Sequence, residues 1–174
     1  RRQREEARRI AQEKEARQKK RRRRRKIIIT SVSSVALAGA LAYGIYFHAI
    51  PYYHYYMANR ALEGGQYESA KEQFLALNGY LDSAALSQEC DYRAALAALN
   101  GGTFTSLRTA QAGFDALGDY KDSAEKAQEA RYVTAEKLLA AGSYEEAIRY
   151  YEQVPAYADA RMKRKQAEYE WANE

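Results

Sequence analysis

The sequence is poor in cysteine, proline and histidine, and each scarcity limits the fold or the kinds of site that the chain can form. Its 174 residues include one cysteine, two prolines and two histidines. The single cysteine, Cys90, excludes a disulfide within the chain and falls short of a metal site, and its apolar surroundings predict a small buried side chain. The scarcity of proline, with abundant alanine and leucine after residue 57, predicts an all-α protein.

Patterns that enzymes use to hold phosphate, metal or a nucleophile are also missing. The sequence shows no glycine-rich phosphate loop, no metal-ligand spacing and no histidine near a plausible nucleophile. His48 and His54 stand six residues apart without acidic neighbours, which makes them poor metal ligands. We therefore expect no enzymatic activity, no metal and no cofactor in these residues.

One long stretch, residues 27–50, contains no charged side chain. As a helix it would span roughly 36 Å at about 1.5 Å of rise per residue, against roughly 30 Å for the hydrocarbon core of a bilayer. This predicts a single transmembrane helix. A cleaved signal peptide is the alternative, but the long basic region before the stretch and the length of the stretch favour an uncleaved anchor.

Charge is divided unevenly around this stretch. Residues 1–26 hold 15 basic and 4 acidic side chains, whereas residues 27–174 hold 13 basic and 19 acidic ones. Because cytoplasmic flanks of membrane helices are rich in Lys and Arg, we expect a cytoplasmic N-terminus and an extracytoplasmic remainder at the cell membrane. We expect the cations next to the stretch to face the lipid bilayer rather than a specific nucleic acid. These membrane-interface candidates are Arg21, Arg22, Arg23, Arg24, Arg25 and Lys26 on one side, and Tyr46, Tyr52 and Tyr53 on the other.

Small residues recur within the apolar stretch. Ala36, Ala40 and Gly44 are spaced four residues apart, a pattern that lets two helices approach closely. A homodimer through this stripe is therefore one arrangement that the sequence allows.

From Tyr55 onward the sequence repeats itself. Equivalent glycines and tyrosines recur with a period of 37 once a three-residue insertion between Phe104 and Ala110 is allowed for. Such a period is typical of stacked helical repeats. The predicted domains are a basic segment (1–26), the transmembrane helix (27–50) and a repeat domain (52–174), with units at about 52–81, 82–121 and 122–158 and a terminal helix at 159–174.

Each unit has the pattern of two helices and two tight turns. The first apolar segment ends at a glycine such as Gly102, a residue suited to a helix C-terminus. The second segment has apolar residues at spacings of three and four, which indicates an amphipathic helix. The turn that follows carries an aspartate (Asp82, Asp122 or Asp159), which we expect to cap the next helix.

This pattern resembles a tetratricopeptide repeat: a small residue on the first helix, then a glycine, an aromatic residue, an alanine and a second aromatic residue. The matching residues are Ala58, Gly65, Tyr67, Ala70 and Phe74, then Ala95, Gly102, Phe104, Ala110 and Phe114, then Ala135, Gly142, Tyr144, Ala147 and Tyr151. The period of 37 exceeds the family's usual value of about 34. A Tyr-x-Asp turn replaces the family's closing proline, as in bacterial cell-surface repeat proteins, which these turns resemble. The resemblance implies a stack of αα-hairpins, about three units plus a terminal helix.

The resemblance also implies a concave groove that holds peptides or helices of partner proteins. The groove position on each first helix lies three residues before the small alanine, and a second position lies one turn further on. The candidate partner-binding residues are Tyr55, Asn59, Tyr92, Leu96, Tyr132, Glu136 and Tyr169. The alternative is that these tyrosines pack between neighbouring hairpins.

We therefore expect a membrane-anchored scaffold for protein–protein interaction. The alternative is a receptor-like or lipid- or nucleic-acid-binding protein. Such a protein would act through the basic segment and a domain upstream of Arg1, where no initiator methionine stands.

Overall fold

A computed structural model describes residues 2–173 of the chain, and their side chains from residue 14 onward. Every regular element in this range is helical, so the predicted all-α fold is confirmed. The elements are α1 (Arg2–Gly44), the π-helical segment η1 (Ile45–Ala49), α2 (Ile50–Glu63), α3 (Tyr67–Ala76), α4 (Ser83–Gly101), α5 (Phe104–Leu117), α6 (Ser123–Ala140), α7 (Tyr144–Gln153) and α8 (Ala160–Ala172). The chain divides into two compact units, residues 1–52 and 53–174.

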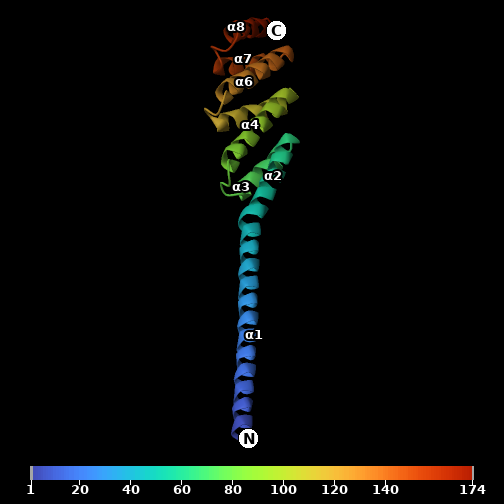
Figure 1. The fold of residues 1–174 in the computed structure, drawn as a ribbon. Coiled ribbons are helices and arrows are strands. Elements are labelled where there is room, and N and C mark those ends of the chain that lie inside the picture. The colour runs from blue at the N-terminus through green and yellow to red at the C-terminus, as the bar shows by residue number, and fades with distance from the viewer. Residues whose placement is uncertain (1, 174) are drawn as a thin grey trace. The chain divides into compact units, whose positions relative to one another are not determined.

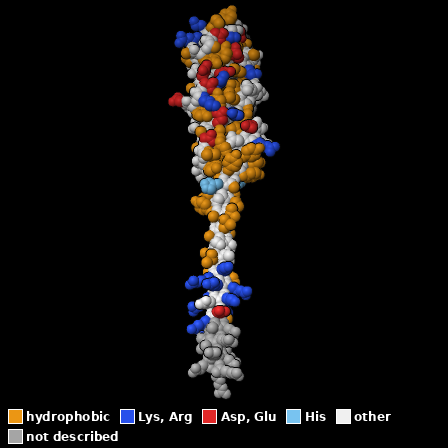
Figure 2. Space-filling view, viewed as in Figure 1, with side chains coloured by type: hydrophobic (Ala, Val, Ile, Leu, Met, Phe, Trp, Pro, Cys, Tyr) orange, Lys and Arg blue, Asp and Glu red, His pale blue; other side chains and the backbone are white. Residues whose placement is uncertain are grey.

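The first unit contains α1, η1 and the first residues of α2. One helix, Lys14–Glu63, is long and apolar enough to cross a membrane, and its charge-free stretch, residues 27–50, lies in this unit. Its apolar side chains are exposed, and Figure 2 shows them following a band of Lys and Arg. The four hydroxyl side chains near the start of the apolar stretch are satisfied within the helix: Thr30, Ser31, Ser33 and Ser34 donate to carbonyls three or four residues earlier. The helix therefore presents these polar groups without an unmet hydrogen bond, as a lipid environment requires.

The change from α-helix to π-helix at η1 comes just before Pro51. Proline has no N–H to donate, and its ring crowds the carbonyl four residues earlier. In η1 the Ile50 N–H donates to the Ile45 carbonyl, five residues earlier. This wider turn gives a local reason why the helix does not end at Pro51, the second residue of α2.

The second unit is a stack of hairpins, in which successive helices pack on one another from α2 to α8 (Figure 1). We call α2, α4, α6 and α8 the first helices and α3, α5 and α7 the second helices. Gly102 ends α4 in the left-handed conformation, with φ of 62°, as predicted for a helix C-terminus. The three-residue insertion falls in α5, which has 14 residues where α3 and α7 have 10.

The core repeats with the sequence. Three small residues of the first helices, Ala58, Ala95 and Ala135, are 0%, 3% and 0% exposed, so all three lie in the core. Helices α4 and α5 approach closely beside Ala95, because a Cβ added to Gly113 would lie 3.0 Å from the Ala95 Cβ. Each hairpin also buries one large aromatic side chain from its second helix: Phe74, Phe114 or Tyr151. Cys90 is buried beside Phe74 and Ala58, as its apolar surroundings predicted.

Candidate functional site

The predicted groove tyrosines form one repeated hydrogen bond. The Tyr55 hydroxyl donates to Asp82 Oδ1 at 2.6 Å, and the Tyr92 hydroxyl donates to Asp122 Oδ1 at 2.5 Å. In the third hairpin Tyr132 donates to Asp159 in the same way. In every case the tyrosine lies on a first helix and the aspartate lies at the start of the next first helix. The bond therefore ties each hairpin to its successor.

The rings of these tyrosines also pack within the stack. The Tyr92 ring meets the rings of Phe114 and Tyr120 edge-on, with centroids 5.9 Å from each. Tyr55 makes the equivalent edge-on contacts with Phe74 and Tyr80 at 6.0 and 6.1 Å. Tyr132 meets Tyr151 edge-on at 5.9 Å and lies tilted against Tyr157 at 5.5 Å. Each ring is half-buried. The structure thus gives these tyrosines a structural role, and only one part of each ring remains accessible.

The aspartates take a different role from the predicted one. Asp82, Asp122 and Asp159 do occupy the N-cap positions of α4, α6 and α8, but none of them makes a side-chain cap hydrogen bond. Their backbone φ lies near −100° and ψ near 20°, outside the extended region that capping residues usually adopt. The carboxylate accepts the tyrosine hydroxyl instead, so the prediction of side-chain capping was wrong.

The hydrogen bond shifts the ionisation of both partners. The bond from Tyr92 holds the pKa of Asp122 below its usual value, and the same bond raises the pKa of Tyr92. Burial and the bond to Asp159 raise the pKa of Tyr132 in the same direction. A lowered carboxyl pKa stabilises the fold at neutral pH, and this contribution is lost as the pH falls through the lowered value.

The other groove candidates lie close to these pairs. The Asn59 side chain donates to the Tyr55 carbonyl at 3.0 Å, and Leu96 is half-buried against the core of the second hairpin. Glu136 accepts from Tyr132 at 3.3 Å and lies 3.6 Å from the ammonium group of Lys163 on α8. Tyr169, in α8, is 72% exposed.

A hollow lies between two first helices, α6 and α8. No second helix contributes to it, and its lining residues are Val133, Glu136, Lys137, Leu139, Ala140, Lys163, Gln166 and Glu170. The lining has two acidic and two basic side chains, so a bound segment would meet charges of both signs there. Among the seven predicted groove residues, Glu136 lines this hollow.

Sequence reasoning missed a cluster around Glu89 in the second hairpin. The carboxylate accepts from Arg93 at 2.9 Å, from the Tyr120 hydroxyl at 3.1 Å and from Lys121. Burial alone would raise the pKa of Glu89, but the hydrogen bonds from Lys121, Arg93 and Tyr120 outweigh it, and the pKa lies below its usual value. Leu81 and Ala158 stand at the positions equivalent to Lys121, so only the second hairpin can build this cluster.

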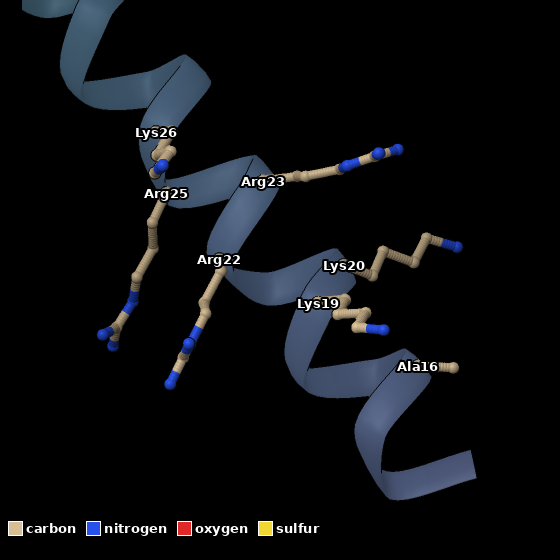
Figure 3. Close-up of a pocket in the computed structure, with 7 residues that line it drawn as sticks. All are labelled: Ala16, Lys19, Lys20, Arg22, Arg23, Arg25 and Lys26. Carbon is tan, nitrogen blue, oxygen red and sulfur yellow. The ribbon is translucent and has the colours of Figure 1, made fainter. Parts of the chain in front are cut away.

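The membrane-interface candidates lie on exposed helix surface. Figure 3 shows six cations, from Lys19 to Lys26, around one helix together with Ala16. Their side chains spread outward, so the space among them is open surface rather than an enclosed cavity. Tyr46, Tyr52 and Tyr53 are exposed, and so are Ala36 and Ala40, whereas Gly44 is half-buried.

No group of three or more His, Cys, Asp and Glu side chains that could hold a metal ion occurs in the part of the chain whose side chains are described. Burial raises the pKa of the Cys90 thiol, which does not favour a reactive thiolate. Comparison with protein-family models, with curated proteins and with solved structures gives no match.

Proposed function

We propose that this chain is a single-pass membrane anchor for a tetratricopeptide-like domain of the bacterial type that binds a peptide or protein segment outside the cytoplasm. The binding surface is the face formed by the first helices. The observation that carries the proposal is the hollow between α6 and α8, which two first helices line without any second helix.

The tyrosine–aspartate pairs support this assignment indirectly. They fix each first helix to the next one, through Tyr55, Tyr92 and Tyr132. Binding surfaces that are held rigid lose less conformational entropy when a partner binds. In this proposal the tyrosines form the floor of the surface, while Asn59, Leu96 and Glu136 contact the partner.

Site-specific photo-crosslinking in cells that express the full chain tests the binding face. A photoreactive residue at Lys137 or Gln166 samples the hollow, whereas Glu72 on α3 and Glu146 on α7 are exposed control positions on second helices. We expect a discrete adduct from both hollow positions and none from the controls. Adducts of equal yield from all four positions, or from none of them, would refute the proposed surface.

The proposed topology has a separate test. Cys90 can be replaced by alanine, because Ala130 and Ala167 stand at its equivalent positions. In this background, single cysteines replace Gln18 or Asn173, which are both exposed. An impermeant maleimide should label Asn173→Cys on intact cells and Gln18→Cys only after permeabilisation. The reverse pattern would overturn the orientation.

A further inference from the structure

A run of cations lies directly before the apolar part of α1. All eight residues from 19 to 26 are lysine or arginine, and all eight are exposed. Among residues 14–173, none of the ion pairs involves a member of this run. The basic side chains of the repeat domain differ, because many of them pair with carboxylates. The run therefore carries a concentrated charge that no ion pair among residues 14–173 neutralises.

The charge surrounds the helix on every side. Successive residues of an α-helix are about 100° apart, so eight consecutive cations cover the full circumference twice. Figure 3 shows this directly, with Arg22 and Arg25 pointing away from Lys20 and Arg23. A nucleic acid or a protein surface touches a helix from one side and would leave much of this charge unmatched. Lipid head groups around a helix that crosses a bilayer contact it from all sides.

The axial extent of the run also fits a head-group layer. Eight residues cover about 12 Å along the helix axis. The polar layer on each side of a bilayer is roughly 5–8 Å thick, and electrostatic attraction extends about another 8 Å at physiological salt. Lys26 stands beside Ile27, where the apolar stretch begins. Five of the eight cations are arginines, whose planar guanidinium groups bind phosphate through two parallel hydrogen bonds.

We propose that residues 19–26 bind a ring of anionic phospholipids in the leaflet at the N-terminal end of the membrane span. The ligand is the phosphate of a negatively charged head group, and zwitterionic lipids are the competitors that it displaces. The inference rests on the membrane span of the proposed function but is independent of the partner-binding face.

The test uses the full chain reconstituted in phosphatidylcholine vesicles that contain a minority of phosphatidylglycerol. Electron paramagnetic resonance of spin-labelled lipids measures which lipid the protein immobilises. We expect a preference for spin-labelled phosphatidylglycerol over phosphatidylcholine that falls as the salt concentration rises. One cation near an anionic surface corresponds to a preference of about fivefold.

A charge-matched pair of variants locates the effect. The triple variant Arg22→Gln, Arg23→Gln, Arg25→Gln should lose most of the preference. The control variant Arg108→Gln, Arg161→Gln, Lys165→Gln removes the same charge from exposed sites of the repeat domain and should retain it. Equal loss in both variants would refute a site at residues 19–26.

Two further outcomes overturn the proposal in distinguishable ways. If the chain inserts into the vesicles but immobilises both lipids equally, the lipid site is wrong and the membrane span stands. A fluorescent RNA oligonucleotide that binds the chain in pure phosphatidylcholine vesicles, and is released by the first triple variant, would then assign the cations to nucleic acid. If the chain does not float with vesicles after alkaline extraction, the span itself is wrong.

Discussion

Replacing Tyr151 by phenylalanine removes a buried hydroxyl that has no hydrogen-bond partner among the described side chains. The Tyr151 side chain is 1% exposed and lies in the core of the third hairpin with Ala135 and Ala147. Phe74 and Phe114 stand at the equivalent positions of the other two hairpins and are equally buried. The stack therefore already accepts phenylalanine at this position, and Tyr151→Phe should fold in the same way.

The expected change in stability follows from the unmet hydroxyl. A buried polar group without a partner costs about 1–3 kcal/mol, and the small void left by the missing oxygen offsets part of the gain. We expect a net stabilisation of about 1 kcal/mol. For a domain of about 120 residues, unfolding entropy is near 0.25 kcal/mol per kelvin, so the melting temperature should rise by about 4 °C.

The pH dependence gives a second and independent readout. Burial, followed by the charges of Glu136 and Asp159, raises the pKa of Tyr151 to about 12. An unfolded tyrosine ionises near pH 10, whereas the folded Tyr151 stays neutral until about pH 12, so the folded state of the wild type loses stability between pH 10 and 12. The wild type should therefore lose stability over this interval faster than Tyr151→Phe, and the difference between the two should widen.

The assay is thermal unfolding of the full chain in detergent micelles, followed by near-ultraviolet circular dichroism at pH 7 and at pH 10–11.5. Tyr150→Phe is the matched control, because Tyr150 lies at the partly buried edge of the same core. The control should leave the melting temperature at pH 7 unchanged. A lower melting temperature for Tyr151→Phe at pH 7 would show that its hydroxyl is bonded in the folded protein, and would refute the reasoning.

Three further predictions follow from the repeat. Ser123→Ala should leave stability unchanged or raise it by up to about 1 kcal/mol in the same melting assay. The reason is that Ser123 Oγ is buried without a hydrogen-bond partner among the described residues, and that a buried alanine, Ala160, fills the equivalent position. A clear loss of stability would contradict this. Ala135→Leu should destabilise the domain by about 1–3 kcal/mol, because Ala135 is fully buried, and an unchanged melting temperature would disprove the tight helix contact. Tyr92→Phe removes the hydrogen bond that lowers the pKa of Asp122, so the variant should lose less stability than the wild type when the pH falls below about 4. An acid transition as steep as that of the wild type would show that this bond does not contribute to stability.

The period made burial of the repeated alanines predictable from the sequence. The alanines that define the repeat are all buried, and so is the second aromatic residue of each unit, Phe74, Phe114 or Tyr151; the first aromatic residue of each unit is partly buried at Tyr67 and Tyr144 and exposed at Phe104. The all-α stack and the long apolar helix followed from the same kind of pattern, since helical periodicity and composition are local properties of the chain.

The partner of each aspartate was not predictable in the same way. An aspartate before a helix fits both an N-cap and an acceptor for a distant hydroxyl, and its local sequence is the same in both cases. The spacing of the pairs does follow the repeat. Tyr55–Asp82 and Tyr132–Asp159 are 27 residues apart, and Tyr92–Asp122 are 30 apart because the three-residue insertion lies between them. The insertion that lengthens α5 leaves the pair intact, and only the fold shows why. The Glu89 cluster was less visible still, since it occurs in one hairpin and has no repeat to reveal it.

Ion pairs between neighbouring hairpins favour one order of the hairpins along the stack. Lys71 on α3 meets Asp91 on α4 at 2.7 Å, and Asp115 on α5 meets Arg131 on α6 at 2.6 Å. Asp91 and Arg131 occupy equivalent positions of their first helices but carry opposite charges. If α6 took the place of α4 against α3, Arg131 would lie beside Lys71, and if α4 took the place of α6 against α5, Asp91 would lie beside Asp115. Exposed pairs of this kind contribute at most about 1 kcal/mol each to stability. Their larger effect is on specificity, because an exchange of α4 and α6 would replace each of these two attractions by a repulsion.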